Sequence, residues 1–149
     1  MGHSYTFLIT HIVFGTRFRW RCIDQPLRTE LYPYCRAVAR ALKCDAIEIG
    51  GSDDHLHMLV RMHPSVATAD FIGTLKSNSS KWVHDKWPSR RFGWQTGYSA
   101  FSVDRRRINA LARYIRNQEE HHKGQSFADE YRDLLRAQGI AFDERCMLD

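Results

Sequence analysis

The chain alternates between stretches rich in β-branched and aromatic residues and stretches where apolar residues recur every three or four positions. Residues 5–16 belong to the first kind and predict a strand with two apolar faces. From about Asp24, with Pro26 near the first turn, a helix is predicted to pack on the core. Its apolar stripe consists of Leu27, Leu31, Tyr34, Cys35, Val38 and Leu42. Pro33 lies inside this stripe and predicts a kink or a break.

The same alternation continues along the rest of the chain. Two strands are predicted at residues 46–51 and 55–62, joined by a polar turn at residues 52–54. A helix is predicted from about Thr68 to Trp87, because Pro88 cannot continue it. A loop is predicted at 89–97 and a strand at 98–103. A helix capped by Asp104 follows from 105 to about 122. A last helix is predicted to begin at a capping box formed by Ser126 and Asp129 and to end at Gly139.

The order of these elements indicates the fold class. A βαββαβ order predicts an α+β domain of the ferredoxin-like type, with an antiparallel sheet and helices packed on one face, followed by C-terminal helices. The 149 residues fit one domain, with a core at about residues 5–123 and a helical tail at about 126–149.

Composition excludes several classes of protein. Hydrophobic residues make up 43% and charged residues 26% of the chain, and no run of eighteen apolar residues predicts a membrane span. The N-terminal residues lack a basic leader and a cleavage site, so we expect a cytoplasmic protein. The four cysteines are far apart and form no CxxC pair, which favours reduced thiols over a zinc site or disulfides.

The formal net charge of +5 suits a polyanionic partner such as nucleic acid. Cations alternate with aromatic residues at 17–21, a pattern suited to phosphate contacts and base stacking, although a solvated strand end shows the same pattern. Polar residues of the second helix are further candidates, against the alternative of an ordinary helix exterior. The cations at 105–107 are candidates as well, because they open a helix whose dipole they oppose, and contacts with DNA backbone would account for this placement. The predicted nucleic-acid contacts are Arg17, Arg19, Lys76, Ser80 and Arg105.

His55 and His57 are the first candidates for chemistry. Side chains alternate along a strand, so the two imidazoles share one face, about 7 Å apart, while Leu56 and Met58 face the core. They can converge on one divalent ion, which then needs a third protein ligand. The alternative is a pair of exposed polar residues on a sheet surface.

Tyr114 and Gln118 are the second pair. Residues four apart project from the same face of a helix. A phenol that attacks phosphate must lose a proton whose usual pKa is about 10, and a nearby divalent ion assists this step. The Gln118 amide oxygen can complete the coordination that the histidines begin. The alternatives are a packing aromatic and a surface amide.

The other histidines show no spacing that suggests a shared ligand. They are expected to lie outside the site, with the two at 121 and 122 interacting with a helix C-terminus. These residues are His3, His11, His63, His84, His121 and His122. Asp53 and Asp54 can orient His55, but a role in the turn is the simpler interpretation.

Four segments in this order resemble the single-tyrosine HUH transposases of small insertion sequences, over about residues 5–127. The segments are HLHMLV at 55–60, LKSNSSKW at 75–82, GYSAFSV at 97–103 and RYIRNQEEHH at 113–122. The resemblance implies that His55, His57 and Gln118 bind Mg²⁺ or Mn²⁺ and that Tyr114 is the nucleophile. The tail from residue 131 departs from the shortest relatives and is not expected to touch the catalytic residues.

The resemblance also implies a reaction and its partners. Such enzymes cleave single-stranded DNA at hairpin-bearing element ends, form a 5′-phosphotyrosine intermediate and rejoin strands. They are homodimers in which the tyrosine helix can complete the partner's site. The active site can therefore be built within one chain or across two, and both arrangements remain open. The expected setting is the bacterial or archaeal cytoplasm, with the enzyme on the nucleoid when it is bound.

Three alternatives fit the same residues. The same chemistry can serve a host, in a domesticated enzyme that nicks and joins repeat elements. The fold also occurs in non-catalytic nucleic-acid-binding modules, which stack bases on exposed strands. A metal-dependent hydrolase would use water in place of tyrosine.

Overall fold

A computed structural model describes residues 2–149, so Met1, the first residue of the predicted domain, lies outside it. The sheet has four strands in the order β2-β3-β1-β4. The strands are β1 (Leu8–Gly15), β2 (Asp45–Gly51), β3 (His55–Met62) and β4 (Ser99–Ser102). The helices are α1 (Gln25–Ala41), α2 (Thr68–Lys86), α3 (Ile108–Arg116), α4 (Gln118–His121) and α5 (Phe127–Ala137), with short 3-10 turns η1 (Arg17–Arg19) and η2 (Arg105–Arg107).

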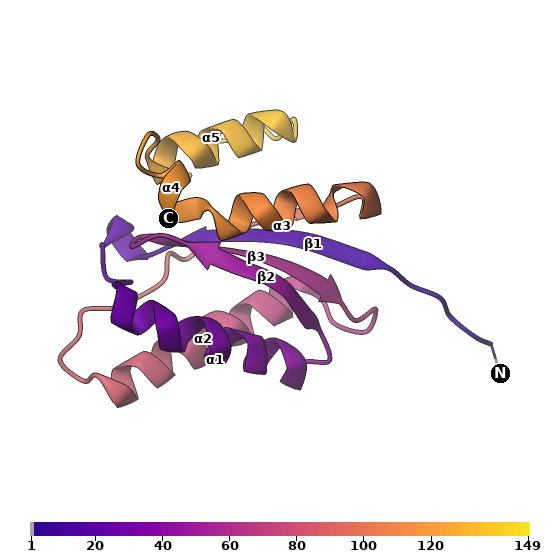
Figure 1. Cartoon of the computed structure of the whole chain (residues 1–149), viewed down its shortest axis with the longest axis horizontal. Helices are drawn as coiled ribbons and strands as arrows, with labels where there is room; N and C mark the ends of the chain where they lie inside the picture. The colour runs from indigo at the N-terminus through magenta and orange to yellow at the C-terminus, as the bar shows by residue number, and fades with distance from the viewer. Residues whose placement is uncertain (1) are drawn as a thin grey trace.

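The strand pairing confirms the predicted fold class. β1 pairs antiparallel with β3 and β4, and β2 pairs antiparallel with β3. The helices α1 and α2 cover one face of the sheet, while α3 and α5 lie over the other (Figure 1). The sheet is therefore covered on both faces, by α1 and α2 on one side and by the C-terminal helices on the other.

The alternation of side chains along β1 and β3 explains these two layers. On one face, Phe14, Leu56 and Met58 are fully buried against α1 and α2. On the other face, Leu59 packs with Ala112 and Ile115 of α3. Toward β4, α5 adds a third apolar cluster, formed by Val13, Phe101, Phe127, Tyr131, Leu135 and Met147.

Two predicted features of the helices are wrong. The helix predicted from 105 to about 122 is divided, because Asn117 has non-helical angles between α3 and α4. Of the kink or break predicted at Pro33, the break is wrong, since α1 runs through the proline. Leu31 and Cys35 flank Pro33 and are both fully buried. We attribute the intact helix to this burial, which offsets a proline cost of about 3 kcal/mol.

Strand β1 is shorter than predicted at both ends. It ends at Gly15, and the backbone then turns through Phe18 (φ 52°) and Arg19 (φ 54°), so the alternating cations do not extend the strand. Strand β4 is also shorter, at four residues. Phe18 is left 74% exposed at this turn.

A close approach between α3 and β2 fixes the position of the tyrosine helix. A Cβ atom on Gly50 would lie 2.0 Å from the carbonyl oxygen of Ile115. Gly50 is also the register partner of His57 on β3. Only glycine therefore lets α3 lie this close to the strand beside the histidines.

Within residues 2–149, none of the helices combines the length and apolar character needed to cross a membrane.

Candidate active site

The predicted histidine pair lies on the face of β3 that α3, α4 and α5 cover. His55 and His57 are both fully buried. Their rings are 5.1 Å apart and nearly perpendicular. Burial on this scale rules out the alternative of two exposed polar residues, because buried imidazoles need polar partners.

Glu130 of α5 supplies those partners, although the sequence analysis assigned it no role. Its side chain is almost fully buried. Oε1 lies 3.0 Å from Nε2 of His57, 3.0 Å from Nε2 of His122 and 3.5 Å from Nε2 of His55. Glu130 lies one residue before the tail from residue 131, which was expected not to touch the catalytic residues, so this carboxylate falls outside that expectation.

Tyr114 reaches the same carboxylate from α3. Its hydroxyl donates a hydrogen bond to Oε2 of Glu130, and its ring lies edge-on to His57 at 5.8 Å. Burial and the negative charge of Glu130 raise the pKa of Tyr114 above its usual value. A single chain therefore brings the tyrosine to the histidine pair.

Gln118 bridges the histidines and Glu130 despite the break after α3. Its Oε1 lies 2.8 Å from Nε2 of His55, and its Nε2 donates to Oε2 of Glu130 at 2.9 Å. Since a carboxylate only accepts hydrogen bonds, this contact fixes the amide orientation. The amide oxygen of Gln118 consequently faces the histidines, as a metal ligand requires.

The Nδ1 atoms of both predicted histidine ligands are also held. Nδ1 of His55 lies 2.8 Å from Oδ1 of Asp54, so this aspartate orients the imidazole as well as belonging to the turn. Nδ1 of His57 is hydrogen-bonded to Nε2 of His11 at 2.9 Å. His11 was expected to lie outside the site; that was wrong, because the alternation along β1 places it on the same face. Such outer contacts fix which nitrogen faces a metal.

The electrostatics of the site follow from burial and these contacts. Burial alone raises the pKa of Glu130, but hydrogen bonds from His122 and His57 outweigh it and hold the pKa well below its usual range. Burial lowers the pKa of His57 to about 4, against the opposing effect of Glu130. Burial and the neighbouring His57 lower the pKa of His11 to about 3. The carboxylate is therefore charged and both histidines are neutral near neutral pH.

His122 also lies in the site, against the expectation that it only interacts with a helix end. Its Nε2 lies 3.0 Å from Oε1 of Gln118, and His55, His122 and Glu130 offer ligand atoms within 4.8 Å of one another. This buried group of side chains has the donor chemistry of a divalent metal site. His121 is nearby too, 3.4 Å from Oε2 of Glu130.

The site thus contains residues that sequence reasoning missed, and two signals could have identified them. His122 follows Gln118 by four positions, the same spacing that links Gln118 to Tyr114. Glu130 lies between Phe127 and Tyr131 on the apolar stripe of α5, where a solvated carboxylate is not expected.

Comparison with known proteins shows the family of the chain. The family described as "Transposase IS200 like" matches residues 4–118. The chain belongs to the IS200-like transposase family. Transposases for the insertion sequence element IS200 from Salmonella typhimurium (strain LT2) and Salmonella typhi are each 27% identical to it over 120 residues, which cover 76% of this chain and 78% of each relative. Membership in a transposase family implies a DNA-processing enzyme.

Two solved structures share the fold of this IS200-like chain. A candidate transposase from Deinococcus radiodurans R1 has a TM-score of 0.65 and 21% identity, with 79% of this chain and 96% of that one covered. A REP-associated tyrosine transposase bound to a REP hairpin has a TM-score of 0.60 and 12% identity, with 82% and 74% covered.

The five predicted DNA contacts of this IS200-like transposase are not brought together. Lys76 and Ser80 belong to α2, on the opposite face of the sheet from the site. The Lys76 ammonium is bound by the carbonyl oxygens of residues 95–97, so its donors are already used. Arg105 stacks on Phe7 at 4.3 Å. These roles in DNA binding remain predictions.

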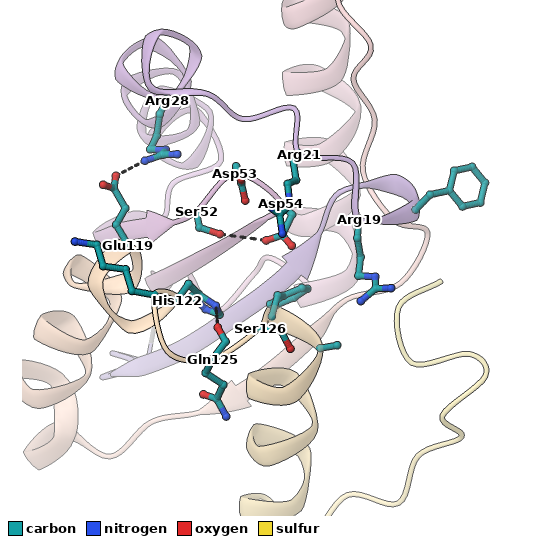
Figure 2. A pocket seen from close by; sticks show the side chains of 14 residues that line it. Arg19, Arg21, Arg28, Ser52, Asp53, Asp54, Glu119, His122, Gln125 and Ser126 are labelled. Atoms are coloured by element: carbon teal, nitrogen blue, oxygen red, sulfur yellow. Dashed lines mark hydrogen bonds and ion pairs between the residues drawn. The ribbon is translucent and has the colours of Figure 1, made fainter.

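Arg19 lines a pocket beside the active site. The pocket has a volume of about 630 Å³ and lies between η1, the β2–β3 turn and the α4–α5 connection (Figure 2). Its cations include Arg19, Arg21 and Lys123, and the exposed Phe18 also lines it. His122 forms part of its wall and so connects the pocket to the buried donors.

Proposed function

We propose that this transposase cleaves and rejoins single-stranded DNA, with Tyr114 as the nucleophile. One observation carries the proposal: the hydroxyl of Tyr114 and Nε2 of His57 contact the two oxygens of the same Glu130 carboxylate. The phenol therefore lies next to the nitrogen and oxygen donors of the candidate metal site. This arrangement suits a tyrosine that attacks a phosphate bound at a metal.

His55, His57 and Gln118 would hold the divalent ion, Mg²⁺ or Mn²⁺. Their imidazole nitrogens and amide oxygen converge, and Asp54 and His11 hold the outer nitrogens of the two imidazoles. When bound, the ion polarises the scissile phosphate and stabilises the charge that develops on it.

Tyr114 performs the bond exchange. Its Oη attacks the phosphorus as the phenol proton passes to Glu130, the bond from phosphorus to the 3′ oxygen breaks, and the departing 3′ oxygen takes up the proton that Glu130 then releases. The products are a 5′-phosphotyrosine and a free 3′-hydroxyl. The phenol proton lies in the hydrogen bond to Glu130, which is the acceptor in reach. A second 3′-hydroxyl can reverse the exchange without ATP, because the phosphotyrosine bond conserves the phosphodiester energy.

The proposed substrate is the hairpin-bearing end of a mobile element in bacterial or archaeal cytoplasm. A relative of the same fold was solved with a REP hairpin, which supports this class of substrate. The pocket beside the site offers Arg19, Arg21 and Lys123 to the phosphates and Phe18 to a base. We further propose a homodimer, in which the tyrosine helix either stays in its own chain or completes the partner's site. The domesticated role remains an alternative with the same chemistry.

The test uses a single-stranded oligonucleotide copied from the DNA that flanks the coding sequence, with its adjacent hairpin. With Mn²⁺, the 3′-labelled strand should become protein-linked and the 5′-labelled strand should shorten. Tyr114→Phe should abolish the adduct and keep DNA binding. Tyr98→Phe, a control at an exposed tyrosine, should react like the parent protein.

Two outcomes would overturn the proposal. If Tyr114→Phe still forms the adduct, another residue is the nucleophile. If the DNA is cut but neither labelled fragment becomes protein-linked, the enzyme is a hydrolase that uses water.

A further inference from the structure

Two donor atoms of the site belong to the part of the chain after residue 118, where the match to the family ends. They are Nε2 of His122 and Oε1 of Glu130, which lie 3.0 Å apart. Neither belongs to the three-ligand set of His55, His57 and Gln118. These two atoms either line the site without binding the ion or belong to its coordination sphere.

The spacing of the donor atoms favours the second of these alternatives. Ligands about 2.1 Å from an ion in octahedral geometry lie about 3 Å from one another. Oε1 of Gln118 lies 2.8 Å from Nε2 of His55 and 3.0 Å from Nε2 of His122. Oε1 of Glu130 lies 3.0 Å from Nε2 of His57 and 3.5 Å from Nε2 of His55. These contacts, together with the 3.0 Å between His122 and Glu130, have the spacing of neighbouring ligands in one coordination shell, and each of the five atoms takes part in at least one of them.

The hydrogen-bonding capacity of the imidazoles leads to the same conclusion. Nδ1 of His122 lies 2.6 Å from the carbonyl oxygen of Gln125, which only accepts hydrogen bonds, while Nε2 faces Gln118 Oε1 and Glu130 Oε1. His55 has the same arrangement, between the Asp54 carboxylate and the Gln118 oxygen. A neutral imidazole has one N–H and serves only one side, so each ring needs either a second proton or a cation on its inner side. A bound ion would meet this need for both rings at once.

Glu130 has a second role through its other oxygen. Oε2 accepts hydrogen bonds from the Tyr114 hydroxyl and from Nε2 of Gln118. A carboxylate that binds the ion through Oε1 thus fixes the phenol and the amide through Oε2. This links the position of the nucleophile to the metal.

We propose that His122 and Glu130 are metal ligands in this transposase, so that the ion is bound by three imidazoles, one amide oxygen and one carboxylate. This inference rests on the proposed metal-dependent function and extends it. In a six-coordinate ion, one position remains for a phosphate oxygen. A nitrogen-rich set of this kind favours Mn²⁺ or Co²⁺ over Mg²⁺, which prefers oxygen ligands.

The test is metal binding by the full chain, measured by titration calorimetry with Mn²⁺, Co²⁺ and Mg²⁺. Mn²⁺ and Co²⁺ should bind at least tenfold more tightly than Mg²⁺. Glu130→Gln and His122→Asn should each weaken Mn²⁺ binding at least tenfold. The matched controls are Asp133→Asn, an exposed carboxylate on α5, and His84→Asn, an exposed histidine on α2, and neither should change the affinity.

A spectroscopic measurement separates lost ligands from damaged folding. Electron spin-echo spectra of bound Mn²⁺ should show three coupled imidazoles in the parent protein and two in His122→Asn. If affinity and spectra are unchanged in both variants, the ligands after residue 118 are excluded, while the three-ligand site and the proposed function stand. If the parent protein binds none of the three ions, both proposals fail.

Discussion

The hydroxyl of Tyr114 donates a hydrogen bond to Oε2 of Glu130, sixteen residues further along the chain and on another helix. The same carboxylate contacts His57 of β3 and Gln118 of α4. Four elements therefore meet at one buried charge. Because a charge without partners is costly in a protein interior, these contacts make Glu130 important for folding as well as for the proposed chemistry.

This arrangement predicts unequal effects of removing the two partners. Tyr114→Phe removes one of several donors to Glu130 and should lower the free energy of unfolding by about 1–2 kcal/mol. Glu130→Ala leaves the buried polar groups of His57, His122 and Gln118 without their carboxylate and should cost about 3–5 kcal/mol. Urea unfolding in EDTA measures both. Equal losses in the two variants would show that Glu130 is not the centre of the network.

The buried histidines predict loss of stability in mild acid. The pKa of His57 is lowered to about 4 and that of His11 to about 3, both by burial, against 6.5 for an unperturbed imidazole. Their stabilising effect is present above pH 6.5 and is lost as the pH falls toward 4, because the unfolded chain binds the protons first. Each should cost about 2 kcal/mol between pH 7 and pH 5. Urea unfolding in EDTA at the two pH values measures the loss.

Neighbouring groups modify this dependence in known directions. The pKa of His122 is raised, because contacts with Glu130 outweigh its burial, so its contribution is present below pH 6.5 and is lost as the pH rises above that value. The depressed pKa of Glu130 adds a further loss below about pH 4.5. His11→Gln should reduce the loss between pH 7 and pH 5 by about half. Equal stability at the two pH values would contradict the prediction.

The sequence predicted the parts of this molecule that depend on local patterns. The alternation in β3 placed Leu56 and Met58 on the core face and His55 and His57 on the other. Turn residues and helix stripes gave the order of the elements, and that order gave the fold class. These features could be predicted because each depends on residues within one strand or helix.

The missing parts depend on tertiary contacts. Glu130 enters the site only because Phe127 stacks on the His55 ring at 4.1 Å and α5 folds back over the sheet. His11 reaches His57 across two strands, from a β1 that was treated only as core. Lys76 resembled a phosphate ligand on the helix surface, but its ammonium donates hydrogen bonds to the carbonyl oxygens of the loop at residues 95–97. None of these partners is close in sequence.

The close contact at Gly50 gives a prediction about the position of α3, the helix that carries Tyr114. A methyl group at this position would clash with the backbone of Ile115, next to the proposed nucleophile. Gly50→Ala should therefore lower the stability by about 1–3 kcal/mol and weaken strand cleavage, because α3 must shift. The matched control is Gly73→Ala in α2, where a methyl group meets no atom within 4 Å. It should raise the stability by about 1 kcal/mol, since alanine is the better helix former.

Melting temperatures and cleavage rates of the two glycine variants provide the measurement. A loss of stability without a loss of cleavage in Gly50→Ala would show that the position of α3 does not control the reaction. A similar loss in both variants would mean that the close approach is not the cause.

Asp54 holds the His55 ring in the orientation that the proposed metal site requires. Its Oδ1 lies 2.8 Å from Nδ1 of His55 and also accepts a hydrogen bond from Ser52. Burial alone raises the pKa of Asp54, but the hydrogen bond from His55 outweighs it and the pKa is lowered, so the group is a carboxylate at neutral pH. This contact keeps the proton on Nδ1 and leaves the Nε2 lone pair for an ion. Asp54→Asn should weaken Mn²⁺ binding about 10–100-fold.

The adjacent aspartate provides the control for that variant. Asp53 belongs to the same turn and lines the same pocket, and its backbone carbonyl accepts a hydrogen bond from the amide of Ile23. Asp53→Asn removes the same charge from the turn. It should change Mn²⁺ affinity less than about threefold, because solvent and salt partly screen a charge that does not contact the ion or its ligands. If the two variants lose affinity equally, the charge of the turn acts at a distance. A selective loss in Asp54→Asn ties the effect to the His55 hydrogen bond, since it is the Asp54 carboxylate that contacts Nδ1 of the imidazole.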